Sequence, residues 1–344
     1  MLFYTMLICF LVCFLWICKK ANKKKFAAGG VAVVLSVIAG LRYGVGTDYP
    51  TYMINYTFYK MAEIRGLRYA GIYLIAHVAA FIHDDYATWF FLMSCVTVCG
   101  AVYAIYKYNE SFSMGMLLYL FLGCWHNSFN VVKQCAAVSV LLLGQKFLLE
   151  KKFVKWSMVC VAAASFHISA LLMIPVYFFV TREATLKQIV VAFVVSIVVS
   201  ISYDRLMDVM MILKDLSETD VSRSVATRGV NVFRVAVNFA PLILVLFFKK
   251  NCALYDEKYR TWTNMSILNA ALYFAGMNSV YLTRFCLYTE AYNVFLIPYL
   301  ISRSKRKTNQ RIIFSSCLFL YFLFWMYDLQ KGSTTATFHW IFER

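Results

Sequence analysis

A polar and aromatic stretch at residues 41–56, reading LRYGVGTDYPTYMINY, interrupts the long apolar runs of the sequence. Its arginine, Arg42, can bind an anion through two donors at once, and its acid, Asp48, can accept a proton. Tyr49 and Tyr52 lie about one helical turn apart and offer aromatic faces and hydroxyl groups. Asp48 is either a base that acts on a ligand or the ion-pair partner that orients Arg42. The sequence leaves both interpretations open.

Two more places set reactive side chains beside apolar runs. His167 stands in SFHISALLMIP, and a histidine is the natural general base near neutral pH. The alternative is a histidine that only bonds to a backbone carbonyl at a helix turn. Lys133 and Gln134 follow NSFNVV and form a polar cap on a helix start. The alternative to a binding role there is ordinary capping and interfacial anchoring.

The second half of the chain carries arginines beside or inside apolar runs, which is costly in lipid and therefore points to a function. Planar guanidinium groups suit a diphosphate, and tyrosine rings with their hydroxyls suit sugars. The alternative is that these arginines only extend to lipid headgroups. Several arginines together with polar helix faces favour a binding site, made of Arg223, Arg228, Arg234, Arg284, Asn238, Tyr281 and Tyr288.

Composition indicates which elements must position these side chains. The 344 residues are 62% hydrophobic and only 15% charged, and the apolar residues form long continuous runs. Soluble domains are less apolar and a β-barrel would show short alternating segments, so we predict an all-α polytopic membrane protein. The net charge of +17 comes mostly from lysines and arginines that flank the apolar runs, which is typical of membrane topology. A nucleic-acid partner is not expected.

The motifs predict no cofactor and no metal. The 11 cysteines lie mostly inside apolar runs without clustered histidines, which indicates small buried side chains. The sequence has no Walker loop and no dinucleotide fingerprint. A cytoplasmic transferase that uses a nucleotide sugar would need acidic metal ligands, whereas the face predicted to be cytoplasmic is basic.

Residues 153–180 are too long for one membrane span and are expected to form two short helices that turn near His167. Residues 66–83 either span the membrane or re-enter it. Residues 203–228 are expected to lie along the membrane surface as an amphipathic helix. Single spans are expected at residues 2–18, 26–41, 87–106, 114–127, 130–149, 187–203, 229–248, 260–280, 283–301 and 311–328.

The placement of lysines and arginines fixes the predicted topology. With most of them inside, the chain has about 12 spans and both termini outside. The polar segments that hold the candidate site residues then all face the outer side. The whole chain, 1–344, is predicted to be a single integral membrane domain, with extracytoplasmic segments near 42–86 and 203–228.

Three of these places resemble segments of a known family, the EpsG-like, Wzy-type polysaccharide polymerases of bacteria. LRYGVGTDYPTY is similar to the family's Arg-Tyr-x-x-Gly-x-Asp-Tyr-x-x-Tyr segment, and SFHISALLMIP to its Phe-His-x-Ser-Ala-Leu turn. NSFNVVKQCAAVSV resembles the segment that enters a helix carrying Arg-Gln. The order and spacing agree across residues 41–175. Lys133 departs from the pattern, because it stands where the family has arginine and lacks the bidentate geometry.

The resemblance implies an enzyme that transfers a growing glycan from a polyprenyl diphosphate carrier onto a lipid-linked repeat unit. The reaction would need no metal and would take place at the outer face of the bacterial cytoplasmic membrane. The implied partners are polyprenyl-diphosphate-linked oligosaccharides, membrane lipid, and a chain-length regulator and a flippase of the same pathway. The matching positions are Arg42, Asp48, Tyr49, Tyr52, Lys133, Gln134 and His167.

In this interpretation, arginines and Lys133 stabilise the departing diphosphate, and His167 or Asp48 deprotonates the acceptor hydroxyl. Two other classes stay open. A transporter or flippase for a lipid-linked glycan would need polar groups from one face of the membrane to the other. A membrane O-acyltransferase would need a path for an acyl donor.

Overall fold

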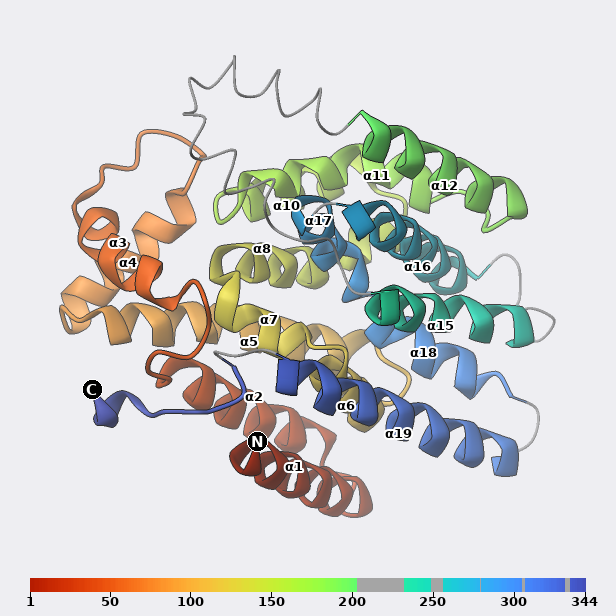
Figure 1. The fold of residues 1–344 in the computed structure, drawn as a ribbon, viewed down its shortest axis with the longest axis horizontal. Helices are drawn as coiled ribbons and strands as arrows, with labels where there is room; N and C mark the ends of the chain where they lie inside the picture. Colours follow the sequence, from red (N-terminus) through yellow and green to blue (C-terminus); the bar gives the residue numbers. More distant parts are fainter. Residues whose placement is uncertain (203–231, 249–255, 279, 305–306, 332–334) are drawn as a thin grey trace. The chain divides into compact units, whose positions relative to one another are not determined.

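The computed structural model of the chain describes residues 1–202, 232–248, 256–278, 280–304, 307–331 and 335–344 (Figure 1). In these residues all regular structure is helical, apart from one isolated antiparallel bridge between Arg42 and Trp340. The predicted all-α class is therefore confirmed for the described part of the chain. Arg223, Arg228 and the surface helix expected at 203–228 lie outside it.

The chain divides into two compact units. Unit 1 comprises Met1–Tyr177 together with Lys305–Arg344, and unit 2 comprises Phe178–Ser304. All three segments that carry the family resemblance belong to unit 1. The description of the whole chain as a single membrane domain stays a prediction.

Unit 1 is organised around α5 (Tyr86–Tyr108), which packs against α2, α4 and α8 (Figure 1). Trp89, Phe90 and Met93 on α5 are fully buried. A glycine brings α2 close to α5, since a Cβ on Gly40 would lie 2.7 Å from the Cα of Phe91. The other helices of the unit are α1 (Leu2–Lys20), α2 (Lys24–Gly40), α3 (Tyr49–Met61), α4 (Ala70–Ile82), α6 (Phe112–Phe121), α7 (Cys124–Asn130), α8 (Val132–Leu143), α9 (Gln145–Leu149), α10 (Phe153–Ala164), η1 (Ile168–Leu172), α19 (Lys307–Lys331) and η4 (Ile341–Glu343).

Three helices of the described residues, α1, α5 and α19, are long and apolar enough to cross a membrane. The other apolar helices have 10–17 residues, so the predicted number of 12 spans is not confirmed. Several predicted spans are broken, among them 114–127 and 283–301. The first breaks at Gly123, whose φ of 79° lies in the left-handed region that glycine tolerates. The second breaks between α17 and α18, at residues 291–292.

The segment at 153–180 is a hairpin, as predicted. Helix α10 ends at Ala164, and the chain continues through η1 into α11 (Met173–Val180). The indole N–H of Trp156 on α10 donates to the carbonyl of Met173 at 2.9 Å, so the two arms lie side by side. In the segment at 66–83, α4 has 13 residues. Its length of about 20 Å is shorter than a hydrocarbon core of ~30 Å and agrees better with re-entry than with a span.

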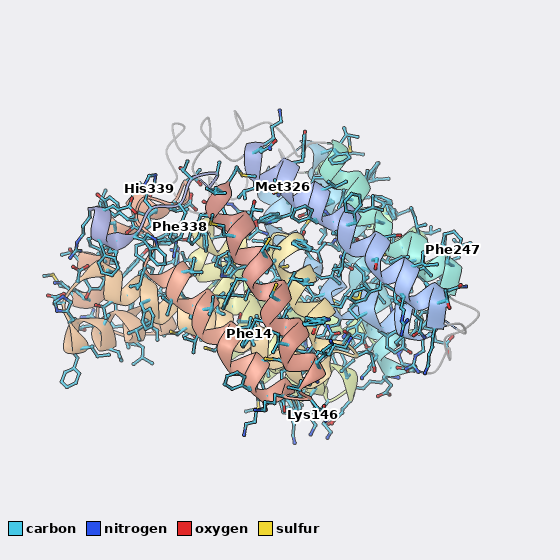
Figure 2. The ribbon with its side chains drawn as sticks, turned by 90° about the horizontal axis from the view of Figure 1, so that it is seen from below. Phe14, Lys146, Phe247, Met326, Phe338 and His339 are labelled. Atoms are coloured by element: carbon cyan, nitrogen blue, oxygen red, sulfur yellow. The ribbon has the colours of Figure 1, made fainter. Side chains whose placement is uncertain are left out.

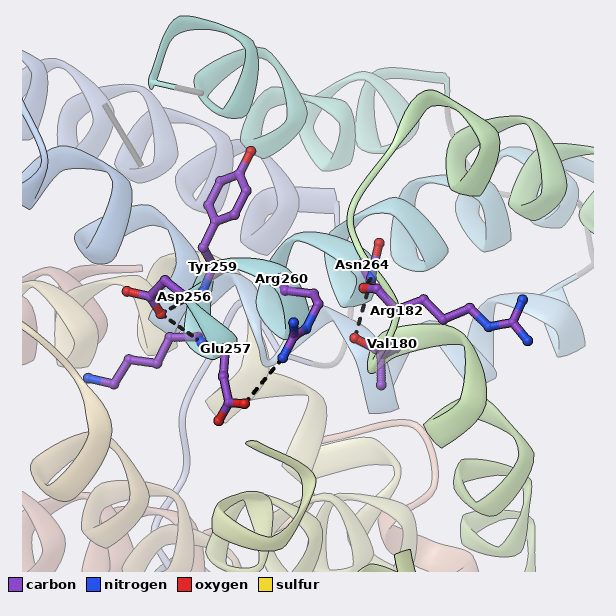
Figure 3. A network of polar contacts seen from close by, with 8 residues as sticks. Val180, Arg182, Asp256, Glu257, Tyr259, Arg260 and Asn264 are labelled. Carbon is purple, nitrogen blue, oxygen red and sulfur yellow. Dashed lines mark hydrogen bonds and ion pairs between the residues drawn. The ribbon is translucent and has the colours of Figure 1, made fainter. Parts of the chain in front are cut away.

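Unit 2 is organised around α16 (Glu257–Ala275), which contacts α12, α15, α17 and α18. Asp256 caps its first turn by accepting from the backbone N–H groups of Lys258 and Tyr259, at 2.9 and 3.3 Å (Figure 3). Two turns into the helix, the Asn264 amide donates to the carbonyls of Val180 and Arg182, which ties α16 to the start of the unit (Figure 3). The neighbouring helices are α12 (Leu186–Ile201), α15 (Val232–Phe248), η3 (Gly276–Asn278), α17 (Val280–Glu290) and α18 (Asn293–Ser302).

Large apolar side chains remain exposed along α1, α12, α15 and α19. Phe247 on α15 is 76% exposed and lies at the edge of the ribbon in Figure 2. Soluble proteins rarely expose so many contiguous apolar side chains, whereas helices in lipid do. The exposed residues of α12 alone are Leu186, Val190, Val191, Val194, Val195, Ile197, Val198 and Ile201.

Candidate active site

Arg42 is only 1% exposed, although it directly follows an apolar helix. Its Nε donates to the Val45 carbonyl and its Nη2 to the Phe129 carbonyl, both at 3.3 Å. Its Nη1 donates to the carbonyl of Ala39, in the last turn of α2. A cation is favourable at that end of a helix. Burial lowers the pKa of Arg42 to about 10, so the guanidinium stays charged at neutral pH.

Aromatic rings enclose the Arg42 guanidinium. Its central carbon lies 4.8 Å from the ring centroid of Phe90, 4.9 Å from that of Phe129 and 5.8 Å from that of Tyr49. These cation–π contacts use the faces that a ligand would otherwise approach. In this structure Arg42 therefore joins α2, the following loop and α7, and its diphosphate-binding role stays a prediction.

The loop before α3 docks onto the end of α7. The backbone N–H and the Oγ1 of Thr47 both donate to Asn130 Oδ1, at 2.7 and 3.2 Å. Gly46 has a φ of 110°, and a Cβ there would lie 2.5 Å from the Phe129 carbonyl oxygen, so only glycine fits. Direct contacts thus hold together two of the segments that resemble the family, LRYGVGTDYPTY and NSFNVVKQCAAVSV.

The C-terminal segment fastens the same loop from its other side. The Tyr43 N–H donates to the His339 carbonyl and the Ile341 N–H donates to the Leu41 carbonyl, each at 2.8 Å. Phe338 stacks on Phe3 of α1 with ring centroids 4.2 Å apart, and Figure 2 labels Phe338 and His339 there. Sequence reasoning did not foresee this contact.

Asp48 precedes α3 and is half-buried. It accepts a hydrogen bond from Thr47 Oγ1 at 3.3 Å. Among the described residues no ion pair joins Asp48 to Arg42, whose three donors go to carbonyls instead. The charge of Asp48 acts on Lys133. The geometry therefore disfavours the interpretation in which Asp48 is the ion-pair partner that orients Arg42.

The inner face of α3 is a row of tyrosines packed on α5. Tyr49 stacks on Phe90 with a centroid distance of 4.5 Å and an interplanar angle of 1°. The ring centroids of Tyr52 and Trp89 are 5.8 Å apart. Both tyrosines are buried, so protein side chains cover the rings that were predicted to bind glycan. Tyr52 forms part of the wall behind Lys133 and Tyr49 lies against Arg42, whereas glycan binding by them stays a prediction.

Lys133 lies in the first turn of α8 and is half-buried. Its Nζ is 4.5 Å from the ring centroid of Tyr69, 5.7 Å from that of Tyr52 and 5.8 Å from that of Tyr59. Three aromatic faces therefore surround one ammonium group. Gln134, the next residue, is buried.

His167 lies at the turn of the hairpin, half-buried, with its Nδ1 2.6 Å from Ser169 Oγ. The neighbouring Ser165 carbonyl accepts from the Gly71 N–H at 3.0 Å, at the start of α4. Tyr69, which covers Lys133, is only two residues before Gly71. The start of α4 thus brings the His167 turn and the Lys133 helix to one place in unit 1.

Of the predicted residues of unit 2, Asn238 belongs to a buried polar network. Asn238 accepts from the Asn269 amide at 2.8 Å and donates to the Arg234 carbonyl at 2.9 Å. Asn269 also accepts from Thr289 Oγ1 at 3.1 Å. Tyr288 is buried and Arg284 exposed, whereas the side chain of Tyr281 lies outside the described residues.

One buried acid of unit 2 was not among the predicted site residues. Glu290, at the end of α17, accepts from the hydroxyl of Tyr273 on α16 at 3.1 Å. A carboxylate inside an apolar bundle is costly and is a candidate for function. The signal that could have found it is an acid within a run of apolar and aromatic residues, CLYTEAYNVFLIP.

All of these segments lie within the part of the chain that a family model matches. The EpsG family model matches residues 29–340, nearly the whole chain. The chain belongs to the EpsG family. No curated protein and no solved structure matches it. Membership confirms the family resemblance and, with the apolar helices, indicates a membrane protein with a role of the polysaccharide-polymerase type.

Proposed function

We propose that this EpsG family member is a repeat-unit polymerase that moves a growing glycan from a polyprenyl diphosphate onto a lipid-linked repeat unit. The observation that carries the proposal is the convergence at the start of α4. There, Lys133 with its tyrosines and the His167 turn meet beside Asp48, although they come from three distant segments. Positive charge, a proton acceptor and aromatic walls are the parts that this transfer needs.

The proposed step forms one bond and breaks one bond. The acceptor hydroxyl oxygen bonds to the anomeric carbon of the growing glycan, and the bond from that carbon to the diphosphate oxygen breaks with inversion. The proton of the hydroxyl passes to a base on the protein, and the polyprenyl diphosphate leaves with the bonding electrons. Lys133 stabilises the negative charge on the leaving group, so the step requires no metal ion.

His167 is the base that we favour over Asp48. The hydrogen bond between its Nδ1 and Ser169 fixes the orientation of the ring, as catalytic histidines require. The charge of Asp48 acts on the Lys133 ammonium group, and its own hydrogen bond comes from its sequence neighbour Thr47. Asp48 is then a group that orients Lys133.

The unit 2 residues extend the proposal to the diphosphate and the glycan. Arg234, Asn238 and Tyr288 border a buried polar network within an apolar bundle, where such groups are retained for function. Arg223, Arg228 and Arg284 are proposed to bind phosphate oxygens, and Tyr281 to contact sugar.

The proposal also includes a location. The enzyme lies in the cytoplasmic membrane of a bacterium, crosses it about 12 times, and faces outward with its site. It receives lipid-linked units from a flippase and works with a chain-length regulator. Cysteine labelling tests the orientation, since a cysteine at position 48 that reacts only from the cytoplasmic side contradicts it.

The test of function is reconstitution in liposomes with lipid-linked repeat units from the host. We expect a ladder of longer products with the wild type and none with His167→Ala. The matched control is His83→Ala, because His83 is exposed and lies outside the cluster. Transport of lipid-linked units across the bilayer with no new glycosidic bond would falsify the proposal and favour a flippase.

A further inference from the structure

Arg68 and Lys133 lie against the ring of the same tyrosine, although 65 positions of sequence separate them. The guanidinium carbon of Arg68 is 5.1 Å from the Tyr69 centroid, and the Lys133 ammonium is 4.5 Å from it. The charge of Arg68 acts unfavourably on Lys133. Two like charges held together in this way are typical of a site for an anion.

Neither cation has an ion-pair partner among the described residues. Nearby cations do have partners, since Lys60 pairs with Asp84 at 2.6 Å and Arg65 pairs with Glu63 at 2.7 Å. The contrast within one region shows that acids are available to neutralise cations there. Asp48 offsets part of the Lys133 charge, which leaves a net positive charge at the pair.

Tyr69 holds its place at the expense of backbone strain. Its φ of 64° is left-handed, a region that residues other than glycine rarely adopt. Strain of this kind persists where surrounding structure fixes it, and it gathers at functional sites. Here it brings the side chain of Tyr69, the residue before α4, between the two cations.

The helix ends add to the positive potential. α4 and α8 both begin here, and neither has an acidic residue in its first turn. The start of a helix is its positive end, so Lys133 in the first turn of α8 has the unfavourable sign. A bound anion would offset this repulsion between the Lys133 charge and the positive end of α8.

We propose that Arg68, Tyr69 and Lys133 form the subsite that holds the diphosphate of the lipid carrier. This inference rests on the proposed function and assigns one part of it. Arg68 supplies the planar, two-donor geometry that Lys133 cannot, and Lys133 supplies a point charge on the second phosphate. Arg68 is thus a substrate-binding residue that the motif comparison did not indicate.

The experiment measures binding, without turnover, to the purified full chain in zwitterionic nanodiscs. The probe is farnesyl diphosphate, with inorganic pyrophosphate as a second arm. We expect Arg68→Gln and Lys133→Gln each to weaken binding of both probes about 10- to 100-fold, the loss for a charged hydrogen bond. Lys133→Arg is expected to bind as tightly as the wild type or tighter.

The matched control is Arg65→Gln, which removes another exposed charge, three positions away, that is already paired with Glu63. Equal loss in this control would show a general surface effect and overturn the subsite. Unchanged binding in Arg68→Gln would overturn it as well. Binding that appears only when phosphatidylglycerol is added to the nanodiscs would assign the pair to lipid headgroups instead.

Binding and transfer separate this inference from the proposed function. Loss of binding in the variants of a chain that makes no glycan ladder supports the subsite and contradicts the polymerase. A ladder that persists in Arg68→Gln, with binding unchanged, supports the polymerase and contradicts the subsite. Thermal unfolding of each variant near the wild-type temperature shows that folding is intact, as expected for the exposed Arg68.

Discussion

Replacing Arg42 by alanine tests whether this arginine stabilises the fold or contacts substrate. The substitution removes donors from the carbonyls of Ala39, Val45 and Phe129, and leaves those oxygens buried without their cation. A hydrogen bond to a charged group contributes about 1.5–3 kcal/mol, and breaking a buried charged cluster costs about 3–5 kcal/mol in total. We therefore expect Arg42→Ala to lose about 3–5 kcal/mol of stability.

The assay is thermal unfolding in nanodiscs, followed by tryptophan fluorescence. At about 2–4 °C per kcal/mol, the expected loss lowers the melting temperature by roughly 6–20 °C. Arg42→Lys keeps the charge but not the three-way geometry, so its melting temperature should fall between those of Arg42→Ala and the wild type. The exposed Arg68→Ala serves as the control and should change the melting temperature little.

One result would refute this reasoning. If Arg42→Ala unfolds at the wild-type temperature and loses farnesyl diphosphate binding, the guanidinium faces the ligand and not the three carbonyls. The opposite result, a large loss of stability with binding retained at low temperature, would confine Arg42 to positioning the loop.

Two more predictions concern the same part of unit 1. Gly46→Ala should cost about 1–3 kcal/mol, because its Cβ would meet the Phe129 carbonyl at 2.5 Å at a φ of 110°. Gly44→Ala, with a φ of 63° and open space around the Cβ, is the control and should lower the melting temperature less. For pH dependence, hydrogen bonds from Lys60 and Tyr56 hold the pKa of Asp84 below its ordinary value. Burial raises the pKa of Asp85, but hydrogen bonds from the Ala87 N–H and from Arg344 outweigh it and lower the pKa. Because both folded-state values lie below the unfolded one, near 4, the stabilisation is complete above about pH 4 and is lost as pH falls through the lowered values. Limited proteolysis between pH 6 and 3 should show the turn at 83–86 opening, and Asp84→Asn/Asp85→Asn should already be open at pH 6.

Much of the fold could be predicted from the sequence, because the hydropathy of a segment depends only on its own run of residues. The hairpin at His167 followed from length alone, since 28 residues of helix exceed a bilayer. The breaks at Gly123 and at 291–292 did not follow, because the segments around them are long and apolar enough on average to be taken for single spans. The docking of Asn130 onto Thr47 depends on long-range pairing that spacing does not encode.

The candidate site was harder to predict, because burial decides the role of a charge. Arg42 and Lys133 are both cations next to apolar helices, and no feature of the sequence separates them. In the structure both lie against aromatic rings, but among the described residues only Arg42 of the two donates to backbone carbonyls. Arg68 was passed over because it lies in a polar linker with Arg65, and only the fold brings it to Lys133.

Arg42, Arg68 and Lys133 in unit 1 illustrate how an apolar protein separates structural charge from functional charge. A charge that stabilises the fold must have its hydrogen bonds satisfied by the protein, as Arg42 does, since an unsatisfied buried group costs several kcal/mol. A charge that binds a ligand must remain incompletely paired in the ligand-free state, as Arg68 and Lys133 do, or the ligand would have to displace its partner first. Arg42 fixes the loop that leads to Asp48. This distinction predicts that Arg42→Lys and Lys133→Arg, which exchange the same two residue types, affect different quantities: stability in the first and diphosphate affinity in the second.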